Sequence, residues 1–300
     1  MGEPPESEHY LVLPVASLPA DPHWLLGQPR PVIAVGEGHP GNADVVVADE
    51  SALPALLRNI ERTPRAALAL VQVLRIGEQL PVASAMTVES LAYATLQTGA
   101  EYQAWLSGRE AAPCEVLGDG EPILFSRDGG VVRAELNRAD NRNSLTVELR
   151  DALIELLELV LLDDSIEQLY ISGRGNCFSV GGELREFGLS SDPATGHWVR
   201  SIHNPGRLLA RCARRVSFHV HGACVGSGIE LPAFAHHLCA KSRTFFQLPE
   251  LSFGLIPGAG GCVSIARRIG RHRTAWMALS GKKINTRTAL EWGLIDEIAP

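Results

Sequence analysis

The sequence has 300 residues, of which 45% are hydrophobic and 20% charged, the composition of an ordinary globular protein with room for one large domain or two modest ones. Its formal net charge of −7 gives no general attraction to nucleic acid or to an anionic membrane, so we expect neither as a partner. The N-terminus, MGEPPESEHY, lacks the basic start and apolar core of a signal peptide, and the longest apolar run, at 153–162, is too short and too acidic to span a bilayer. We therefore expect a cytoplasmic protein.

The six cysteines give no sign of a metal site. They form neither a C-x-x-C pair nor a Cys/His ligand spacing, so we expect no metal and no disulfide framework. The simplest interpretation is a set of free thiols in a reducing compartment. They are Cys114, Cys177, Cys212, Cys224, Cys239 and Cys262.

The chain opens with three strand-like runs, YLVLPVA, PVIAVG and VVVAD, separated by turns rich in Pro and Gly. We interpret residues 1–47 as a structural extension, because no functional motif lies in them. Residues 48–110 then follow a helical pattern, and residues 111–122 contain the turn residues of a linker.

Three helices are expected in this helical region, at 50–62, 64–80 and 87–109. Pro64 is placed as a helix starter. The third helix carries an apolar stripe, which is typical of a core face or a subunit contact. The stripe consists of Val88, Leu91, Ala92, Thr95 and Leu96.

Residues 123–300 alternate between strands and helices, which predicts an α/β fold. Strands are expected at 124–126, 131–136, 168–172, 215–221 and near 238–240. Helices are expected at 145–162, 197–212 and 228–237.

Two glycine-rich loops follow strands of this second part, GRGNCFSVGGELREF at 173–187 and HGACVGSGIEL at 221–231. Each leads toward a helix, and a helix start presents unpaired N–H groups and a positive dipole end. Two such starts that face each other would form a cradle for a developing oxyanion. A single loop of this kind is usually only a turn.

Two glutamates lie beside these loops. Glu230 stands at a helix start among apolar residues, and Glu250 lies between the runs FFQLP and LSFGLI. Either one alone is best explained as a capping or exposed side chain. Together, next to an N–H donor loop, they favour paired acid–base work in a low-dielectric site.

Five segments carry a family resemblance. In order and spacing they resemble the crotonase (enoyl-CoA hydratase/isomerase) superfamily, over about residues 123–300. They are LNRADNRNSL, GRGNCFSVGGELREF, HGACVGSGIEL, FFQLPELSFGLIPGAGG and LSGKKINTRTALEWGLID. The resemblance implies a crotonase-like spiral ββα core that acts on an acyl-coenzyme A thioester.

The resemblance also implies roles for individual positions. The backbone N–H groups of Gly182 and Ser227 would form the oxyanion hole. Glu230 and Glu250 fall where hydratases of the family carry their two catalytic glutamates, and Gly258 would help to hold the water. The family analogy gives the α-carbon proton to Glu250 and the orientation of water to Glu230.

The expected ligand-binding residues come from the same resemblance. Arg142 and Arg185 lie near the family's coenzyme A-binding positions, although a solvated arginine is the simpler reading of each. Coenzyme A enters as part of the substrate, so no separate cofactor is expected. A homotrimer or hexamer is the expected assembly.

The expected function is an enoyl-CoA hydratase, and three alternatives stay open. Two are enzymes on the same fold, an enoyl-CoA isomerase and an acyl-CoA hydrolase in which Ser227 is the nucleophile and His219 or His221 the base. This hydrolase lacks a G-x-S-x-G elbow. The third is a non-catalytic acyl-CoA-binding subunit. Departures from the family pattern leave room for it, since Ser227 replaces a usual glycine, His236 replaces a common aspartate and Pro232 lies early in a helix.

The order of segments is itself a departure. Family members continue past the GLID segment with about three helices that shape the trimer contact, whereas this sequence ends at Pro300. Residues 48–109 resemble those helices placed first, so we hypothesise a circular permutation with a helical oligomerisation region at the N-terminal side. An unrelated helical domain on a shortened core is the alternative.

Overall fold

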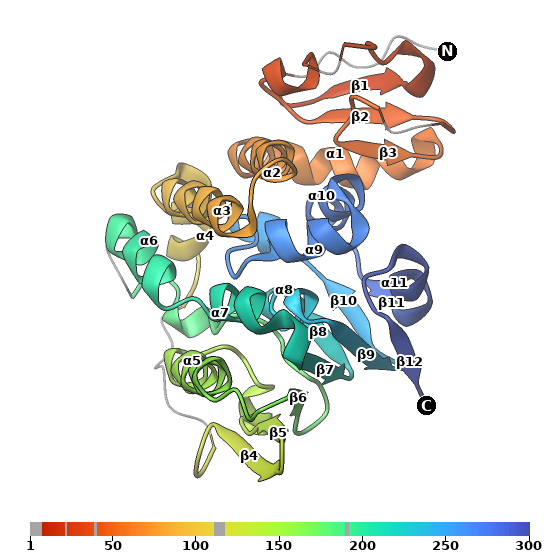
Figure 1. The fold of residues 1–300 in the computed structure, drawn as a ribbon. Helices are drawn as coiled ribbons and strands as arrows, with labels where there is room; N and C mark the ends of the chain where they lie inside the picture. Colours follow the sequence, from red (N-terminus) through yellow and green to blue (C-terminus); the bar gives the residue numbers. More distant parts are fainter. Residues whose placement is uncertain (1–7, 22, 39–40, 111–117, 190–191) are drawn as a thin grey trace.

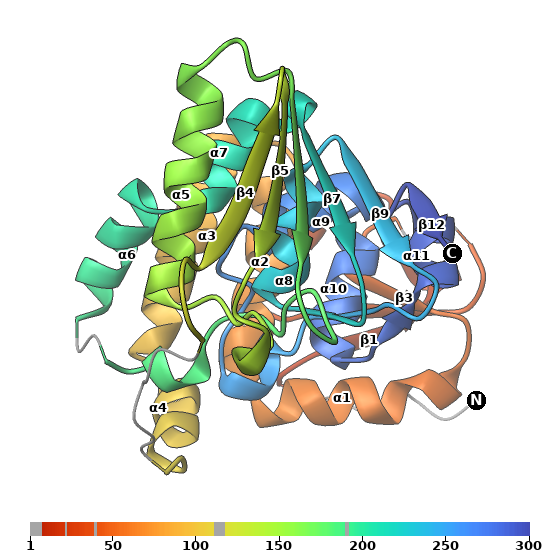
Figure 2. The ribbon, with the colours of Figure 1, turned by 90° about the horizontal axis from the view of Figure 1, so that it is seen from below.

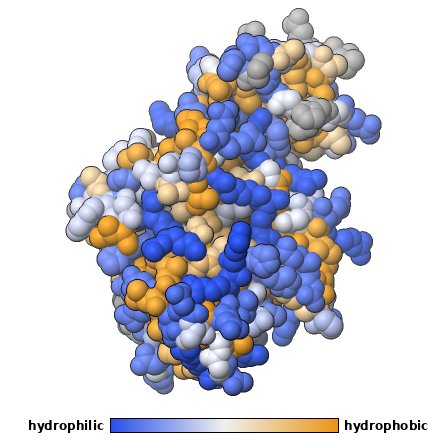
Figure 3. All heavy atoms as spheres, viewed as in Figure 1, coloured by the Kyte–Doolittle hydropathy of each residue, from blue (hydrophilic) through white to orange (hydrophobic). Residues whose placement is uncertain are grey.

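The computed structural model describes residues 8–21, 23–38, 41–110, 118–189 and 192–300 (Figure 1). Most of the predicted linker at 111–122 therefore lies outside the described residues. In the described part, no helix has the length and apolar character needed to cross a membrane. Hydrophobic residues on the face shown in Figure 3 form separate patches between hydrophilic ones.

The three strand-like runs at the start of the chain form a small parallel sheet, which confirms these predicted strands. Its strands are β1 (Leu11–Pro14), β2 (Val32–Val35) and β3 (Val45–Val47). Asp44, just before β3, accepts 2.8 Å hydrogen bonds from the backbone of Val32 and from Nε of Arg75. Because both side chains of the ion pair are buried, the pair holds the sheet firmly on the second helix of the chain.

The helical region contains four helices among the described residues: α1 (Leu53–Arg62), α2 (Pro64–Gly77), α3 (Val82–Gln97) and α4 (Ala100–Ser107). Pro64 begins α2 as predicted. The single helix predicted at 87–109 is wrong in two respects: α3 begins earlier, and the chain breaks before α4. Gly99 adopts an extended conformation, with φ −73° and ψ 150°, which ends the first helix and starts the second.

The core sheet has six strands in the order β12-β9-β7-β6-β5-β4, and they spread like a fan in Figure 2. Only β4 and β5, a hairpin, pair antiparallel; the other neighbours are parallel. The strands are β4 (Ile123–Asp128), β5 (Val131–Leu136), β6 (Gln168–Gly173), β7 (Val216–Val220), β9 (His237–Lys241) and β12 (Glu297–Ala299). The expected α/β class is confirmed.

The second, smaller sheet of the core lies next to the site, in the order β11-β10-β8. Its strands are β8 (Ala223–Val225), β10 (Phe245–Gln247) and β11 (Ile284–Asn285). The larger core helices are α5 (Val147–Leu162), α6 (Pro193–Ile202), α7 (Pro205–Cys212), α9 (Gly261–Ile269), α10 (Arg271–Ser280) and α11 (Thr286–Trp292).

Two predicted core helices need correction, and prolines explain both. The helix predicted at 197–212 is two helices, α6 and α7, because Asn204 caps a new helix whose first residue is Pro205. The helix predicted at 228–237 is a single turn, α8 (Ser227–Glu230), followed by a 3-10 turn that begins at Pro232. The shorter α8 leaves Glu230 at its last position, where the side chain can reach a neighbouring turn.

The helical region packs directly on the core. Helix α2 contacts α9 and α10, and α3 contacts α6 and α9. Helix α3 therefore lies over the segment that joins Glu250 to α9, as Figure 1 shows. Residues far apart in sequence are in this way brought to one site.

Candidate active site

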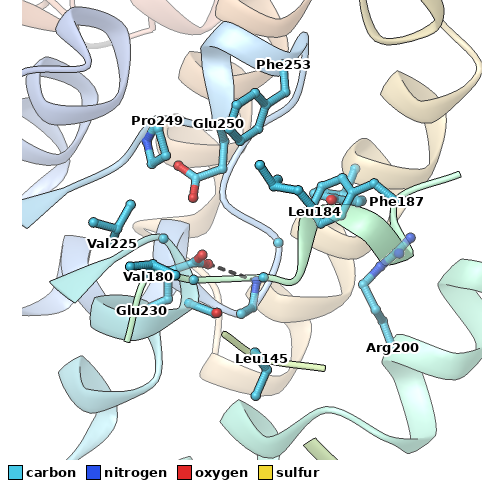
Figure 4. Close-up of a pocket in the computed structure, with 17 residues that line it drawn as sticks. Leu145, Val180, Leu184, Phe187, Arg200, Val225, Glu230, Pro249, Glu250 and Phe253 are labelled. Carbon is cyan, nitrogen blue, oxygen red and sulfur yellow. Dashed lines mark hydrogen bonds between the residues drawn. The ribbon is translucent and has the colours of Figure 1, made fainter. Parts of the chain in front are cut away.

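A cavity of about 370 Å³ lies between the two glycine-rich loops, the turn at 257–261 and two helices (Figure 4). The predicted residues Gly182, Ser227, Glu230, Glu250 and Gly258 all line it. Tyr93 of α3 and Arg200 of α6 line it as well. The apolar part of its wall is formed by Leu145, Val180, Leu184, Phe187, Val225, Pro249, Phe253 and Ala259.

Glycines allow the two loops to approach each other. Gly181 has a φ of +93°, and a Cβ there would lie 2.7 Å from the carbonyl oxygen of Val225. Gly226 has a φ of +52°, and a Cβ there would lie 2.6 Å from Oε1 of Glu250. Any larger residue at either position would push the loops apart or displace the glutamate.

The residues Gly182 and Ser227 lie in the wall of the cavity, and neither backbone N–H group has an acceptor among the described residues. Ser227 is the first residue of α8, where a helix leaves its N–H groups unpaired. The serine is accommodated because Gly226 takes the positive φ of this turn. The Ser227 hydroxyl is buried and has no partner among the described residues.

Glu230 is only 2% exposed and is held by a backbone turn. Its Oε2 accepts hydrogen bonds from the N–H groups of Ala259 at 2.8 Å and Gly261 at 2.9 Å. Burial raises the pKa of Glu230 to about 7, while these N–H groups oppose the shift because they favour the charged form. Glu230 can therefore gain and lose a proton near neutral pH.

Glu250 stands in a different environment. It begins the 3-10 turn Glu250–Phe253, and its Oε2 is buried without a hydrogen-bond partner in the described structure. Burial, and then the negative charge of Glu230, raise the pKa of Glu250 well above its usual value. Glu250 therefore holds its proton more tightly than an exposed glutamate does, and the two carboxyl groups stand in different environments.

A third glutamate, Glu89 of α3, lies against the same turn and was missed from the sequence. It is 1% exposed, and its carboxylate accepts hydrogen bonds from the N–H groups of Gly260 at 2.7 Å and Cys262 at 2.9 Å. Burial and then Glu230 raise its pKa well above the usual value. The signal that could have revealed it is that Glu89 is the one charged residue in the sequence of α3.

Tyr93, one turn after Glu89, was missed as well because a tyrosine on an apolar helical face carries no motif. A Cβ at Gly258 would lie 2.5 Å from the Tyr93 ring, so the glycine leaves room for this side chain. The predicted role of Gly258 in holding water stays a prediction, while its contact with Tyr93 is a structural finding. Tyr93 thus closes the cavity from the side of the helical region.

The structure does not bring the two predicted coenzyme A arginines to the cavity. Arg142 is exposed, in a left-handed conformation with a φ of 51°. Arg185 pairs with Glu183 at 2.8 Å and donates to Oδ1 of Asn141 at 2.8 Å. Their role toward coenzyme A stays a prediction.

The Ser–His pair of the hydrolase alternative is not formed. His221 contacts the carbonyl oxygen of Gly175 through Nε2 at 2.9 Å, and His219 packs edge-on against Tyr170. Both histidines line a separate cavity at the edge of the six-stranded sheet. Within the described chain, no group of three His, Cys, Asp or Glu side chains is placed to hold a metal ion.

Comparison with known proteins agrees with this architecture. The sequence profile described as enoyl-CoA hydratase/isomerase matches residues 126–300. Trans-2-decenoyl-[acyl-carrier-protein] isomerase of Streptococcus mutans is 28% identical over 187 residues, which cover 60% of this chain and 70% of that protein. The 2,3-dehydroadipyl-CoA hydratase of Escherichia coli is 31% identical over 181 residues, which cover 59% of this chain and 69% of that protein.

A solved structure extends the likeness to three dimensions. The enoyl-CoA hydratase from Thermoplasma volcanium superposes with a TM-score of 0.54 at 28% identity, covering 60% of this chain and 72% of that one. The sequence match, the shared fold and the five ordered segments all fall on the part of the chain that carries Glu230 and Glu250. The chain belongs to the enoyl-CoA hydratase/isomerase family, within the crotonase superfamily.

Proposed function

We propose that the protein is an enoyl-CoA hydratase, which adds water across the double bond of a 2-enoyl-coenzyme A thioester. The observation that carries the proposal is the pair of buried glutamates on one cavity, where the pKa of Glu230 is raised to about 7 and that of Glu250 is raised well above its usual value. A pair of titratable groups separated in this way supplies an acid and a base at the same pH. This matches the needs of hydration, which takes one proton from water and gives one to carbon.

The glutamates take different parts in the proposed reaction. Glu230, whose pKa is about 7, accepts a proton from the attacking water. Glu250, whose pKa is raised well above its usual value by burial and by the charge of Glu230, donates a proton to the α-carbon. Since the two carboxyl groups interact, they titrate as a pair rather than independently.

Two N–H groups stabilise the intermediate in this proposal. Negative charge builds on the thioester oxygen as water adds, and the N–H groups of Gly182 and Ser227 are its donors. Each preorganised donor of this kind contributes a factor of roughly 10²–10³ in rate in other enzymes. Neither N–H group has another acceptor among the described residues, which supports the assignment.

The helical region takes part in this function as the permuted counterpart of the family's C-terminal helices. Three observations support the permutation: α3 borders the cavity, Glu89 and Tyr93 complete the site, and the matched relatives have about 30% of their own length outside the match. The same helices are proposed to form the contact of a homotrimer or hexamer. They expose Leu91 and Ile76, which are 50% and 46% accessible.

The direct test is hydration itself. Purified protein is mixed with crotonyl-CoA and with longer and aromatic 2-enoyl-CoAs, and the loss of enoyl absorbance is followed beside identification of the 3-hydroxyacyl product. The Glu250→Gln variant should lose turnover by about 10³-fold because it cannot supply the proton, while thioester binding survives. Glu158→Gln, which changes an exposed glutamate of α5, is the matched control and should behave as wild type.

The same experiment separates the alternatives. Interconversion of 3-enoyl and 2-enoyl thioesters without hydration would identify an isomerase. A trapped acyl-enzyme would identify a hydrolase. Thioester binding without any turnover, unchanged in Glu250→Gln, would identify a binding subunit and contradict the proposal.

A further inference from the structure

Arg200, in helix α6, places a guanidinium group in the wall of an otherwise largely apolar cavity. It is the one Lys or Arg among the described residues that line the cavity. In Figure 4 it lies beyond Leu184 and Phe187, on the opposite side of the labelled residues from Glu230 and Glu250. A cation at this position can contact the part of a ligand that fills this end of the cavity.

Contacts with α3 fix the orientation of the Arg200 side chain. Its guanidinium carbon stacks 4.6 Å from the centroid of the Tyr93 ring, and Nε donates to Oγ of Ser90 at 3.1 Å. Ser90 Oγ in turn lies 2.9 Å from Nδ1 of His197. The terminal nitrogens make only long contacts of 3.5 Å, to Gln97 Oε1 and to the Ser90 carbonyl oxygen. The guanidinium group is therefore held in a fixed orientation, while its two terminal nitrogens make only weak hydrogen bonds within the protein.

The charge of Arg200 has no ion-pair partner among the described residues, although the side chain is partly buried. Two other buried arginine side chains do have an ion-pair partner: Arg75 pairs with Asp44, and Arg138 pairs with Glu148. Burial lowers the pKa of Arg200, which shows that its charge is poorly solvated, but arginine stays protonated. A positioned and poorly solvated cation is the arrangement that binds an anion most strongly.

We propose that Arg200 selects acyl chains that carry a carboxylate at the end remote from the thioester. The inference rests on the proposed function for the position of the thioester, between the N–H groups of Gly182 and Ser227. Tyr93 and Arg200 line the same cavity as these N–H groups, so an acyl chain that fills the cavity can reach them. A planar guanidinium fork matches a carboxylate, with two parallel N–H···O bonds.

A phosphate of coenzyme A is the other source of negative charge. Arg200 lines the same cavity of about 370 Å³ as the two glutamates, where the acyl part of the substrate would react. Arg200 also stacks on Tyr93, whose ring packs against Gly258 in the turn that holds Glu230, so packing connects it to the turn that positions a reacting group. The acyl carboxylate is therefore the partner that the geometry favours.

The test measures binding of saturated thioesters, which cannot be hydrated. Glutaryl-, adipoyl-, pimeloyl- and suberoyl-CoA are compared by calorimetry with the methyl-ended thioesters of equal length. At the best length, the wild-type protein should bind the carboxyl-ended thioester at least about tenfold more tightly. Arg200→Met should remove this preference and leave the affinity for methyl-ended thioesters unchanged, while Arg200→Lys should keep part of it because the charge remains.

Each other outcome overturns the inference. Equal affinities for both series in the wild-type protein, at all four lengths, would contradict it. An equal loss for both series in Arg200→Met, together with weaker binding of free coenzyme A, would assign Arg200 to a phosphate. If Arg200→Met loses thermal stability, the preference for carboxyl-ended thioesters is instead compared between the wild-type protein and Arg200→Lys, and an unchanged absence of preference in both contradicts the inference.

The readout also separates this inference from the proposed reaction. Selective binding of carboxyl-ended thioesters without hydration of the corresponding 2-enoyl thioester would overturn the hydratase proposal and leave the selectivity standing. Hydration of methyl-ended and carboxyl-ended substrates with equal kcat/KM would leave the hydratase standing and overturn the selectivity. The two claims can therefore fail independently.

Discussion

The core at 123–300 and the helical region at 48–110 contribute to one cavity in different ways. The core carries the family match, the glycine-rich loops and the two glutamates of the proposed mechanism. The helical region lies outside the match, yet Glu89 and Tyr93 come from it. The comparison teaches that a motif locates the reacting groups, while the residues that hold and enclose them are set by packing and can come from any part of the chain.

The turn at 257–261, continued into α9, is where the two regions meet. Its successive backbone N–H groups donate alternately to a side chain of each region. Those of Ala259 and Gly261 donate to Glu230 of the core, and that of Gly260 donates to Glu89 of the helical region. Each buried N–H group is thereby paired, as buried backbone groups must be. The position of Glu230 in the cavity consequently depends on a carboxylate of α3.

The largest expected effect comes from the core. Glu230→Gln keeps the size of the side chain but removes the proposed base, so kcat should fall by about 10³-fold. Substrate affinity should change little, since the cavity wall is preserved. Stopped-flow turnover and calorimetry measure the two quantities, with Glu158→Gln as control. A loss below tenfold would show that Glu230 does not handle the proton.

A smaller effect is expected from the helical region. Glu89→Gln replaces one acceptor oxygen by an NH₂ group that faces a backbone N–H, so the turn should shift and kcat should fall about 10–10²-fold. As a positioning residue, Glu89 should affect kcat more than KM and should move the pH profile of kcat/KM. Retained thermal stability with unchanged kcat would show that the helical region only supports the fold.

The smallest expected effect concerns the contact between Gly258 and Tyr93. Gly258→Ala places a Cβ 2.5 Å from the Tyr93 ring, which must move, and kcat/KM should fall by about tenfold. Tyr93→Ala in the same chain should relieve the clash, so a double-mutant cycle should give a coupling of about 1 kcal/mol or more. Gly27→Ala is the control, since a Cβ there has no neighbour within 4 Å. Additive effects would mean that the contact does not matter for the reaction.

The sequence predicted the core well because its motifs are local. The strands around the glycine-rich loops, and the meeting of Gly182, Ser227, Glu230 and Glu250 at one cavity, follow from loops whose backbone geometry demands glycine. Helix ends were harder, because periodicity alone continues a helix through Gly99 or across the break before Pro205. Such breaks depend on capping and tertiary contacts.

The second layer of the site could not be predicted from the sequence. The apolar stripe of α3 indicates a buried face but not what that face contacts, so neither Glu89 nor Tyr93 could be assigned to the cavity. The coenzyme A prediction shows the same difficulty, since Arg142 and Arg185 lie in segments that match the family pattern but do not line the cavity. Long-range packing decided each of these cases.

The dependence of kcat/KM on pH between pH 5 and 10 tests the central claim most directly. If the two buried glutamates handle the protons, kcat/KM should rise with pH near 7 as Glu230 loses its proton, and fall at higher pH as Glu250 loses its own. The curve should therefore be bell-shaped, with its acidic limb above the range of an ordinary carboxyl group. A profile that is flat across this range, or an acidic limb at about pH 4–5 as for an exposed glutamate, would contradict the account.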